Sequence, residues 1–266
     1  MSFKAVFFDL DDTLVVDEVV SREALLATAR RASVTKGAEA ERFVRDATHH
    51  GKRLWQAGPA HPYCRAIGIS AFECLWGKFE GETDDLRRLR EWALPFRAQV
   101  FDHALREQLI ESPDGAQDLA DTFSRERRLR QRLMPDARET LTRLSAKYLL
   151  ALLTNGAPDL QREKISASGL AGFFKAIAVS GEHGMGKPRA EIFHRLASEV
   201  GVAPHEAAMV GNSLERDIAG AANAGITSVW IKVAGSEEHA AVEPDATITG
   251  LAELPAVLER LEGSRP

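Results

Sequence analysis

The sequence predicts an α/β protein in which a doubly wound parallel sheet is interrupted by an inserted helical segment. Two observations lead to this prediction. From about Pro135 onward, short apolar runs alternate with amphipathic helical patterns, which is typical of parallel strands joined by crossover helices. Residues 16–132 instead show helical periodicity and few β-branched runs. We therefore expect a core formed by 1–15 and 133–266, and a separate helical domain formed by 16–132.

The core elements are predicted in chain order from the hydrophobic pattern and its breaks. A first strand at Ala5–Phe8 precedes the inserted segment. After the insertion we expect helix 136–147, strand 148–153, helix 158–168, strand 176–179, helix 189–200, strand 207–210, helix 214–224, strand 226–231, strand 246–249 and helix 251–261. Gly169, Gly201 and Gly225 follow three of these helices and are placed to end them.

The inserted segment is expected to contain four or five helices. Its pattern is broken near Gly37, Gly58-Pro59, Gly81 and Pro113-Asp114-Gly115. Arginines gather near its end, at positions 125, 127, 128, 130 and 132. Because no aromatic residues alternate with them, they indicate a solvated helix face rather than a nucleic-acid surface.

The composition is that of an ordinary soluble globular protein, with 266 residues, 44% apolar and 27% charged. A formal net charge of −5 gives no general attraction to nucleic acid or anionic membrane, so neither is expected as a partner. No segment approaches the roughly 18 apolar residues that span a bilayer, and Ala5–Phe8 is too short for a signal peptide. Cys64 and Cys74 suit a reducing compartment as small buried side chains, and we expect a cytoplasmic protein.

Two aspartates, Asp9 and Asp11, come where the first strand should end. In extended backbone, residues two apart point to the same side, so both carboxylates can face one site. Carboxylates a few ångströms apart repel unless a cation or a shared proton lies between them. A solvated loop after a strand is the alternative for this pair taken alone.

Further polar residues follow the later strands. Thr154-Asn155-Gly156 ends one strand, Lys187 follows a glycine-rich run after the next, and Asn212 and Asp217 follow a third. In an open α/β sheet, ligands bind beyond the carboxyl ends of the strands. We therefore expect these residues to converge on one crevice with the two N-terminal aspartates. Ser213 has a plain structural explanation, as the N-cap of helix 214–224.

The order Asp9, Thr154, Lys187 and Asp217 resembles the haloacid dehalogenase superfamily of aspartate-nucleophile phosphohydrolases. The resemblance covers about the first 15 residues and nearly everything after residue 133. It implies a Rossmann-like core with an inserted helical cap, here 16–132, as in subfamily I.

Phosphoryl transfer needs an in-line nucleophile, a proton donor for the leaving oxygen, and positive charge around the phosphate. Asp9 suits the first task as the nucleophile, and Asp11 suits the second if its surroundings raise its pKa. Lys187 can neutralise phosphate charge, and Thr154 can donate a hydrogen bond to a phosphoryl oxygen. The backbone amides that follow, those of Asn155 and Gly156, are expected to add further donors.

A phosphate dianion among several carboxylates calls for a cation, and Mg²⁺ is the expected cofactor because it takes hard oxygen ligands. The resemblance implies that the Asp9 carboxylate and the Asp11 backbone carbonyl bind it. The fourth motif of the family usually reads Gly-Asp, but this chain has Gly211-Asn212. Asn212 can offer a neutral oxygen, and Asp217 then remains to supply charge.

The residue runs 152–156, 161–165, 210–218 and 223–225 resemble the N-acylneuraminate-9-phosphatase group and its bacterial relatives. The dehalogenases of the superfamily lack an aspartate at the position of Asp11, so the sequence favours a phosphatase. A 2-haloacid dehalogenase is the alternative enzyme. A non-catalytic binding or regulatory protein is the alternative from another class, and Asn212 is the feature that favours it.

The helical segment is expected to select the substrate. His49-His50-Gly51-Lys52-Arg53 and Trp55 form its richest polar cluster, and Arg53 can reach an anionic substrate tail. An ordinary solvated helix is the alternative for each of these residues. The expected substrate is a small phosphorylated metabolite; the particular phosphoester and the oligomeric state stay open.

Overall fold

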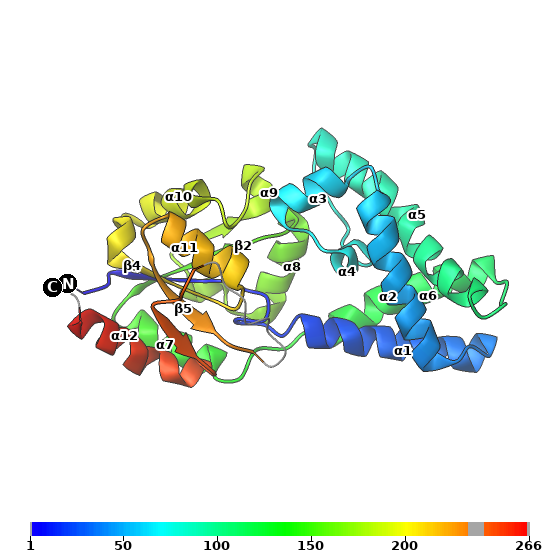
Figure 1. The fold of residues 1–266 in the computed structure, drawn as a ribbon, viewed down its shortest axis with the longest axis horizontal. Helices are drawn as coiled ribbons and strands as arrows, with labels where there is room; N and C mark the ends of the chain where they lie inside the picture. Colours follow the sequence, from blue (N-terminus) through cyan, green and yellow to red (C-terminus); the bar gives the residue numbers. More distant parts are fainter. Residues whose placement is uncertain (1, 234–241, 265–266) are drawn as a thin grey trace. The chain divides into compact units, whose positions relative to one another are not determined.

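The computed structural model describes residues 2–233 and 242–264, and the chain divides into two compact units (Figure 1). The sheet unit contains the chain up to Val16, Arg132–Gly156, and the chain from Gln161 onward. The helical unit contains Asp17–Gln131 together with Ala157–Leu160. Of the predicted core range, residues 1, 234–241 and 265–266 lie outside the described residues.

The described part of the sheet unit holds six strands, all paired in parallel, in the order β3-β2-β1-β4-β5-β6. They are β1 Ala5–Phe8, β2 Leu149–Thr154, β3 Ala176–Val179, β4 Ala207–Gly211, β5 Thr227–Ile231 and β6 Ala246–Ile248. The chain leaves β1 toward β2 and β3, then crosses to β4 on the other side of β1. The predicted doubly wound parallel sheet is confirmed, and its strand order changes direction at β1.

Helices cover both faces of this sheet (Figure 1). They are α7 Ala137–Ser145, α8 Pro158–Ser168, α9 Ser180–His183, α10 Ala190–Val200, α11 Ala219–Asn223 and α12 Leu254–Gly263. Val6 and Phe8 pack in one core cluster with residues of α7 and α12. Ala5 and Phe7 pack in a second cluster with residues of α10 and α11. Because successive strand residues face opposite sides and both sides are covered, β1 is apolar throughout.

The expected single helix at 214–224 is wrong in its first turn. The structure has a π-helix at Leu214–Ile218, followed by α11. The amides of Asp217 and Ile218 both donate to the Ser213 carbonyl, at 2.8 and 3.2 Å, and this shared acceptor widens the turn. The Ser213 hydroxyl accepts from the Arg216 amide at 3.2 Å, so its predicted capping role is confirmed.

The described residues of the helical unit form six helices, where four or five were expected. They are α1 Glu18–Lys36, α2 Ala40–Ala57, α3 His61–Ile67, α4 Ala71–Cys74, α5 Asp84–Arg106 and α6 Pro113–Leu129. The four predicted breaks all lie between helices or at their ends. The missed break is Gly68, which ends α3 at a φ of 82° and leaves α4 with a single turn, too short for periodicity to reveal.

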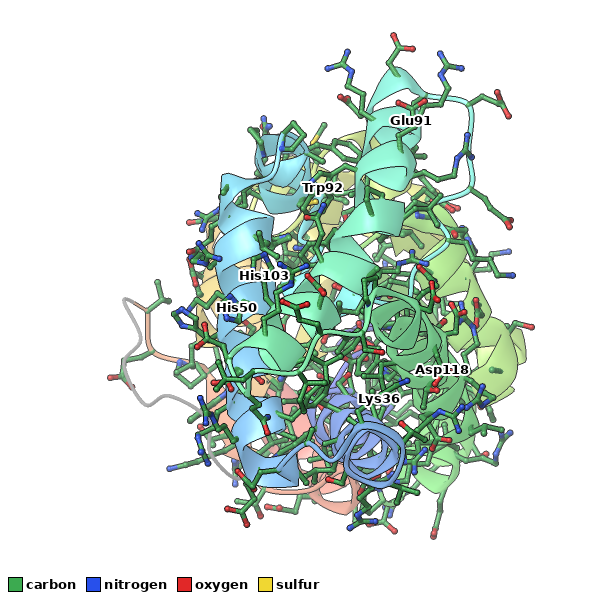
Figure 2. All side chains as sticks on the ribbon, turned by 90° about the vertical axis from the view of Figure 1, so that its right-hand side faces the viewer. Lys36, His50, Glu91, Trp92, His103 and Asp118 are labelled. Atoms are coloured by element: carbon green, nitrogen blue, oxygen red, sulfur yellow. The ribbon has the colours of Figure 1, made fainter. Side chains whose placement is uncertain are left out.

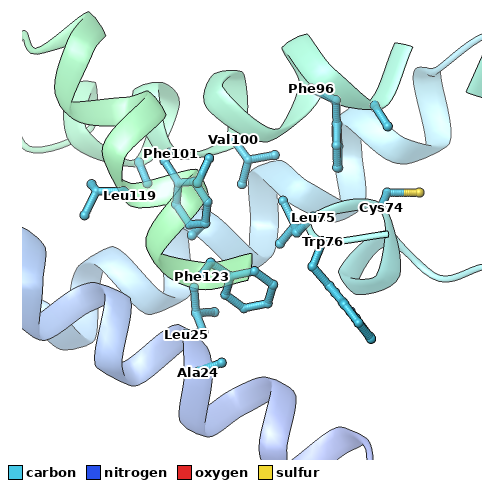
Figure 3. Packing of buried hydrophobic residues seen from close by; sticks show 14 of the residues in the cluster. Ala24, Leu25, Cys74, Leu75, Trp76, Phe96, Val100, Phe101, Leu119 and Phe123 are labelled. Carbon is cyan, nitrogen blue, oxygen red and sulfur yellow. The ribbon is translucent and has the colours of Figure 1, made fainter. Parts of the chain in front are cut away.

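Aromatic and aliphatic side chains fill the interior of the helical unit (Figure 3). The rings of Phe101 on α5 and Phe123 on α6 lie 6.2 Å apart between their centroids. Cys64 and Cys74 are free thiols buried in the same cluster, as predicted. In the described stretches of the chain, no helix has the length and apolarity needed to cross a membrane.

The expected solvated arginine face is wrong for Arg127, which is 1% exposed on α6. Its guanidinium donates to Asp17 and, at 3.0 Å, to the Ser21 hydroxyl, and it lies 4.8 Å from the centroid of the Trp76 ring. A carboxylate, a hydroxyl and an aromatic face therefore compensate the loss of water around this charge.

Candidate active site

Asp9 lies at the carboxyl end of β1, where the strand order changes direction. Its amide donates to the Val210 carbonyl of β4 at 2.9 Å, so the sheet still holds its backbone. The loop that follows closes on itself, with the Asp12 amide donating to Val15 at 2.7 Å. The side chain of Asp9 is 10% exposed. This is the position at which open α/β sheets bind ligands.

Lys187 connects two carboxylates of the sheet unit. Its Nζ lies 2.5 Å from Asp9 Oδ1 and 2.6 Å from Asp217 Oδ1, and its side chain is 2% exposed. Burial alone would lower the pKa of Lys187, but the two carboxylates outweigh that effect and raise its pKa. Lys187 therefore stays an ammonium ion.

Asn155 fixes the segment that carries Lys187. The side-chain Nδ2 of Asn155 donates to the Lys187 backbone carbonyl at 3.0 Å, and the side-chain Oδ1 accepts from the Lys187 backbone amide at 2.9 Å. A Cβ on Gly186 would lie 2.5 Å from Asn155 Oδ1, so only glycine leaves room for this pair of bonds. The side chain of Asn155 thus connects the end of β2 to the backbone of Lys187.

Thr154 is the last residue of β2 and is 1% exposed. Its hydroxyl oxygen accepts a hydrogen bond from Gln161 Nε2 at 2.5 Å. The Gly156 amide, expected to point at a phosphate, instead donates to the Ser180 hydroxyl at 2.8 Å. That expectation is wrong in this structure, because the α9 segment supplies an acceptor that the sequence pattern did not reveal.

Asp217 is buried at the π-helix with both carboxylate oxygens near protein donors. Oδ1 lies beside Lys187, and Oδ2 accepts from the Ser213 amide at 2.9 Å. A Cβ on Gly211 would lie 2.3 Å from Oδ2, so glycine at this position makes the approach possible. Burial, with the nearby Asp9 charge, raises the pKa of Asp217 against the opposing effect of Lys187.

Asn212 presents an oxygen toward the same place as Asp9. The Thr13 hydroxyl lies 3.3 Å from Asp9 Oδ2 and 3.5 Å from Asn212 Oδ1, so both oxygens lie around one buried hydroxyl. Trp230 Nε1 donates to the Asn212 carbonyl at 2.9 Å and holds its backbone.

These oxygens fit a hard divalent cation. A carboxylate oxygen of Asp9 and the neutral amide oxygen of Asn212 both lie around the Thr13 hydroxyl, and Mg²⁺ favours such oxygen ligands. Among the described residues, no group of three or more His, Cys, Asp or Glu side chains is arranged so that it could hold a metal ion. Any metal held here would therefore depend on the neutral oxygen of Asn212 and on backbone or water oxygens.

Sequence reasoning missed two residues of this site, Gln161 and Lys164. Both lie on α8 and both contact the Asp11 carboxylate. Their spacing of three on a predicted helix was the available signal, since it places them on one face. Polar residues at such spacing usually face solvent, so the pattern alone did not single them out.

Arg53 lies on α2 of the helical unit, where its Nη2 is 3.3 Å from His50 Nδ1. His50 stacks on His103 of α5, with ring centroids 4.9 Å apart (Figure 2). The His50 Nε2 atom lies 3.2 Å from Glu107 Oε1. The solvated-helix alternative is therefore wrong for His50, which is 7% exposed, whereas Arg53 itself is exposed.

The fold and the site define an α/β enzyme with its polar centre at the switch point of a parallel sheet. The sequence matches the haloacid dehalogenase-like hydrolase family over residues 3–225, and the chain belongs to this family, as predicted.

Individual relatives agree with this membership. A phosphoserine phosphatase of Thermus thermophilus is 41% identical over 252 residues, covering 94% of this chain and 97% of the relative. An N-acylneuraminate-9-phosphatase of Mus musculus is 30% identical over 268 residues, covering 97% and 95%. A HAD-hydrolase structure from Bacillus subtilis, bound to magnesium, has a TM-score of 0.66 at 23% identity, over 97% of this chain and 99% of that one. At that identity the structural likeness concerns the fold.

Proposed function

We propose that this protein is a magnesium-dependent phosphatase that hydrolyses a small-molecule phosphomonoester through an aspartyl-phosphate intermediate. One observation carries the proposal: a buried aspartate at the switch point, Asp9, lies 2.5 Å from a lysine ammonium, with Asp11 two residues further along. An ammonium at this distance supplies positive charge beside the nucleophile and draws phosphate toward it. The two relatives named above, which act on phosphomonoesters by their names, support the same reaction class.

In the first step, an Asp9 carboxylate oxygen attacks phosphorus and the bond to the leaving oxygen breaks. Asp11 gives its proton to that oxygen, so an alcohol leaves and Asp9 carries the phosphoryl group. In the second step, Asp11 accepts a proton from water as the water displaces Asp9 and releases phosphate. Lys187 and the Thr154 hydroxyl balance the charge of the phosphoryl oxygens during both steps.

The metal would be held by the Asp9 carboxylate, the Asp11 backbone carbonyl and the Asn212 side chain. When bound, Mg²⁺ supplies positive charge that offsets repulsion between the carboxylates and the phosphate dianion. Asp217 acts in this proposal mainly through Lys187, because its two oxygens are engaged by Lys187 and by the Ser213 amide.

The substrate class follows from the relatives and from the site. Phosphoserine and N-acylneuraminate 9-phosphate, named for the two relatives, are both small phosphorylated metabolites. The helical unit would supply the selective contacts as a cap, and Arg53 is the proposed partner for an anionic part of the substrate. The sheet unit and the helical unit are thus proposed as catalytic core and cap.

The dehalogenase alternative rests on the same nucleophile, and Asp11 argues against it. A halide leaves without a proton, so that reaction needs no acid at the leaving group, which is the role proposed for Asp11. In this chain Gln161 and Lys164 both contact the Asp11 carboxylate and fix its position, as a role for Asp11 in proton transfer would require.

The test is phosphate release from p-nitrophenyl phosphate and from a panel of alkyl phosphomonoesters, with added magnesium and with excess EDTA. We expect Asp9→Asn to abolish turnover while its circular dichroism and melting temperature stay near those of the wild type. A mutant that kept more than about a tenth of the wild-type rate would exclude the covalent mechanism. Full activity in EDTA would exclude the metal requirement, and chloride release from a 2-haloacid would then be measured.

A further inference from the structure

Helix α8 turns two polar side chains, Gln161 and Lys164, into the interior of the sheet unit. They are three residues apart and therefore lie on one face of the helix. Gln161 is 0% exposed and Lys164 is 1% exposed. A lysine is rarely buried to this extent unless its charge is compensated, so the contacts of this face call for an explanation.

Both side chains converge on Asp11. Lys164 Nζ lies 3.0 Å from each of the two carboxylate oxygens, a two-point contact. Gln161 Nε2 donates to Asp11 Oδ2 at 3.0 Å and to the Thr154 hydroxyl at 2.5 Å. Three hydrogen bonds from α8 thus fix the orientation of one carboxylate, and one of the donors also contacts the end of β2.

The backbone next to this network is adapted to it. Gly156 has a φ of 144°, and a Cβ at this position would lie 2.8 Å from Gln161 Cγ. Any larger residue would therefore move Gln161 away from Thr154 and Asp11. Gly156, in the loop after β2, leaves room for the Gln161 side chain, as Gly211 at the end of β4 leaves room for Asp217.

We propose that Lys164 and Gln161 are positioning residues that fix the orientation of Asp11 and stabilise the carboxylate that it becomes during proton transfer, an inference that rests on the proposed function. Proton donation to the leaving oxygen turns Asp11 from a neutral acid into a carboxylate. Lys164 stabilises that developing negative charge, and Gln161 fixes the orientation of the Asp11 carboxyl group. In the second step the same carboxylate takes a proton from water, so each turnover returns Asp11 to its neutral form. Proton transfer depends steeply on such orientation.

The test compares two leaving groups, because a positioning role for the acid has a selective consequence. p-Nitrophenolate leaves without help from an acid, whereas an alkoxide needs a proton. We expect Lys164→Met to lower kcat about 100-fold or more for the alkyl phosphomonoester that the wild type cleaves fastest. For p-nitrophenyl phosphate we expect a loss of less than about tenfold, with KM little changed for both substrates.

Three further variants separate positioning from a general structural role. Lys164→Arg keeps the charge and should recover part of the alkyl-phosphate rate. Asp11→Asn and the double variant Asp11→Asn/Lys164→Met should be about equally slow, because both act on one proton transfer. Arg162→Met changes a cation of the same helix that pairs with exposed Glu182 and should keep the wild-type rates.

Equal losses on both substrates in Lys164→Met, or additive losses in the double variant, would overturn the positioning role and leave the proposed function intact. A wild type that cleaves no alkyl phosphomonoester would overturn the proposed function and this inference with it. If Lys164→Met does not fold, Gln161→Met decides the question by the same comparison. It keeps the lysine–aspartate pair and should still slow the alkyl substrate selectively.

Discussion

The contacts of Lys187 predict that replacing it lowers both stability and activity, and that a second substitution at Asp217 restores part of the stability but not the activity. Lys187→Met removes the ammonium that lies between the Asp9 and Asp217 carboxylates. Breaking a buried ion pair by removing one partner costs about 3–5 kcal/mol, and here two carboxylates lose the same partner. We expect a loss in the free energy of unfolding at the upper end of this range.

A second substitution should restore part of that loss. In Lys187→Met/Asp217→Asn, a neutral side-chain amide replaces the carboxylate that Lys187→Met alone leaves buried without its cation. The amide oxygen can still accept a hydrogen bond from the Ser213 backbone amide. We expect the double variant to be more stable than Lys187→Met by about 1–3 kcal/mol. Its activity should stay at least about 100-fold below the wild type, because the cation that balances phosphate is still missing.

Urea unfolding followed by tryptophan fluorescence measures the stability, and phosphate release from p-nitrophenyl phosphate measures the activity. Lys175→Met, at an exposed lysine of the sheet unit, is the matched control and should change neither. A double variant less stable than Lys187→Met would refute the reasoning, since it would mean that Asp217 is not destabilised by losing its cation.

The remaining predictions concern the metal and the acid stability. Asn212→Asp should lower the magnesium concentration at half-saturation and Asn212→Ala should raise it about tenfold, while Asp217→Asn should cost more activity than Asn212→Ala. A magnesium half-saturation in Asn212→Asp and Asn212→Ala equal to that of the wild type would contradict a metal role for Asn212. Burial acts to raise the pKa of Glu262, but Lys147 and the Phe3 amide outweigh it, and the pKa of Glu262 is lowered. A lowered folded pKa stabilises the protein above the unfolded value of about 4.3 and loses this effect as pH falls below it. Glu262→Gln should therefore be less stable by about 1–2 kcal/mol at pH 7, with the gap to the wild type closing near pH 3. A gap that is constant with pH in urea unfolding would show that the charge of Glu262 is not responsible.

Much of the sheet unit could be predicted from the sequence by local reasoning. Strands β1 and β3 have the predicted bounds, β4, β5 and β6 differ by one residue at one end, and β2 is shifted by one residue at both ends. Strands covered on both faces are continuous apolar runs, and the polar residues that follow them mark where they end. For the same reason, Asp9 could be placed at the end of β1 before any contact was known.

The contacts within the site depend on tertiary structure, because they join segments far apart in the chain. Lys187 approaches Asp217 only because the loop after β3 and the π-helix after β4 meet in the folded unit. The first turn after β4 is a π-helix because the amides of Asp217 and Ile218 share the Ser213 carbonyl, which replaces the regular α-helical hydrogen-bond pattern.

Local sequence by itself determined the sheet, its strand ends and the positions of the acidic residues, since burial on both faces leaves a direct pattern. Only the tertiary structure decided which polar side chains turn inward. Arg127 was expected on a solvated helix face and no sequence signal marked Lys164 as buried, yet both are 1% exposed. Their burial is stabilised by Asp11 and Asp17, which lie more than a hundred residues away along the chain. A charged side chain on a helix carries no local sign of its partner, so its burial follows from the fold alone.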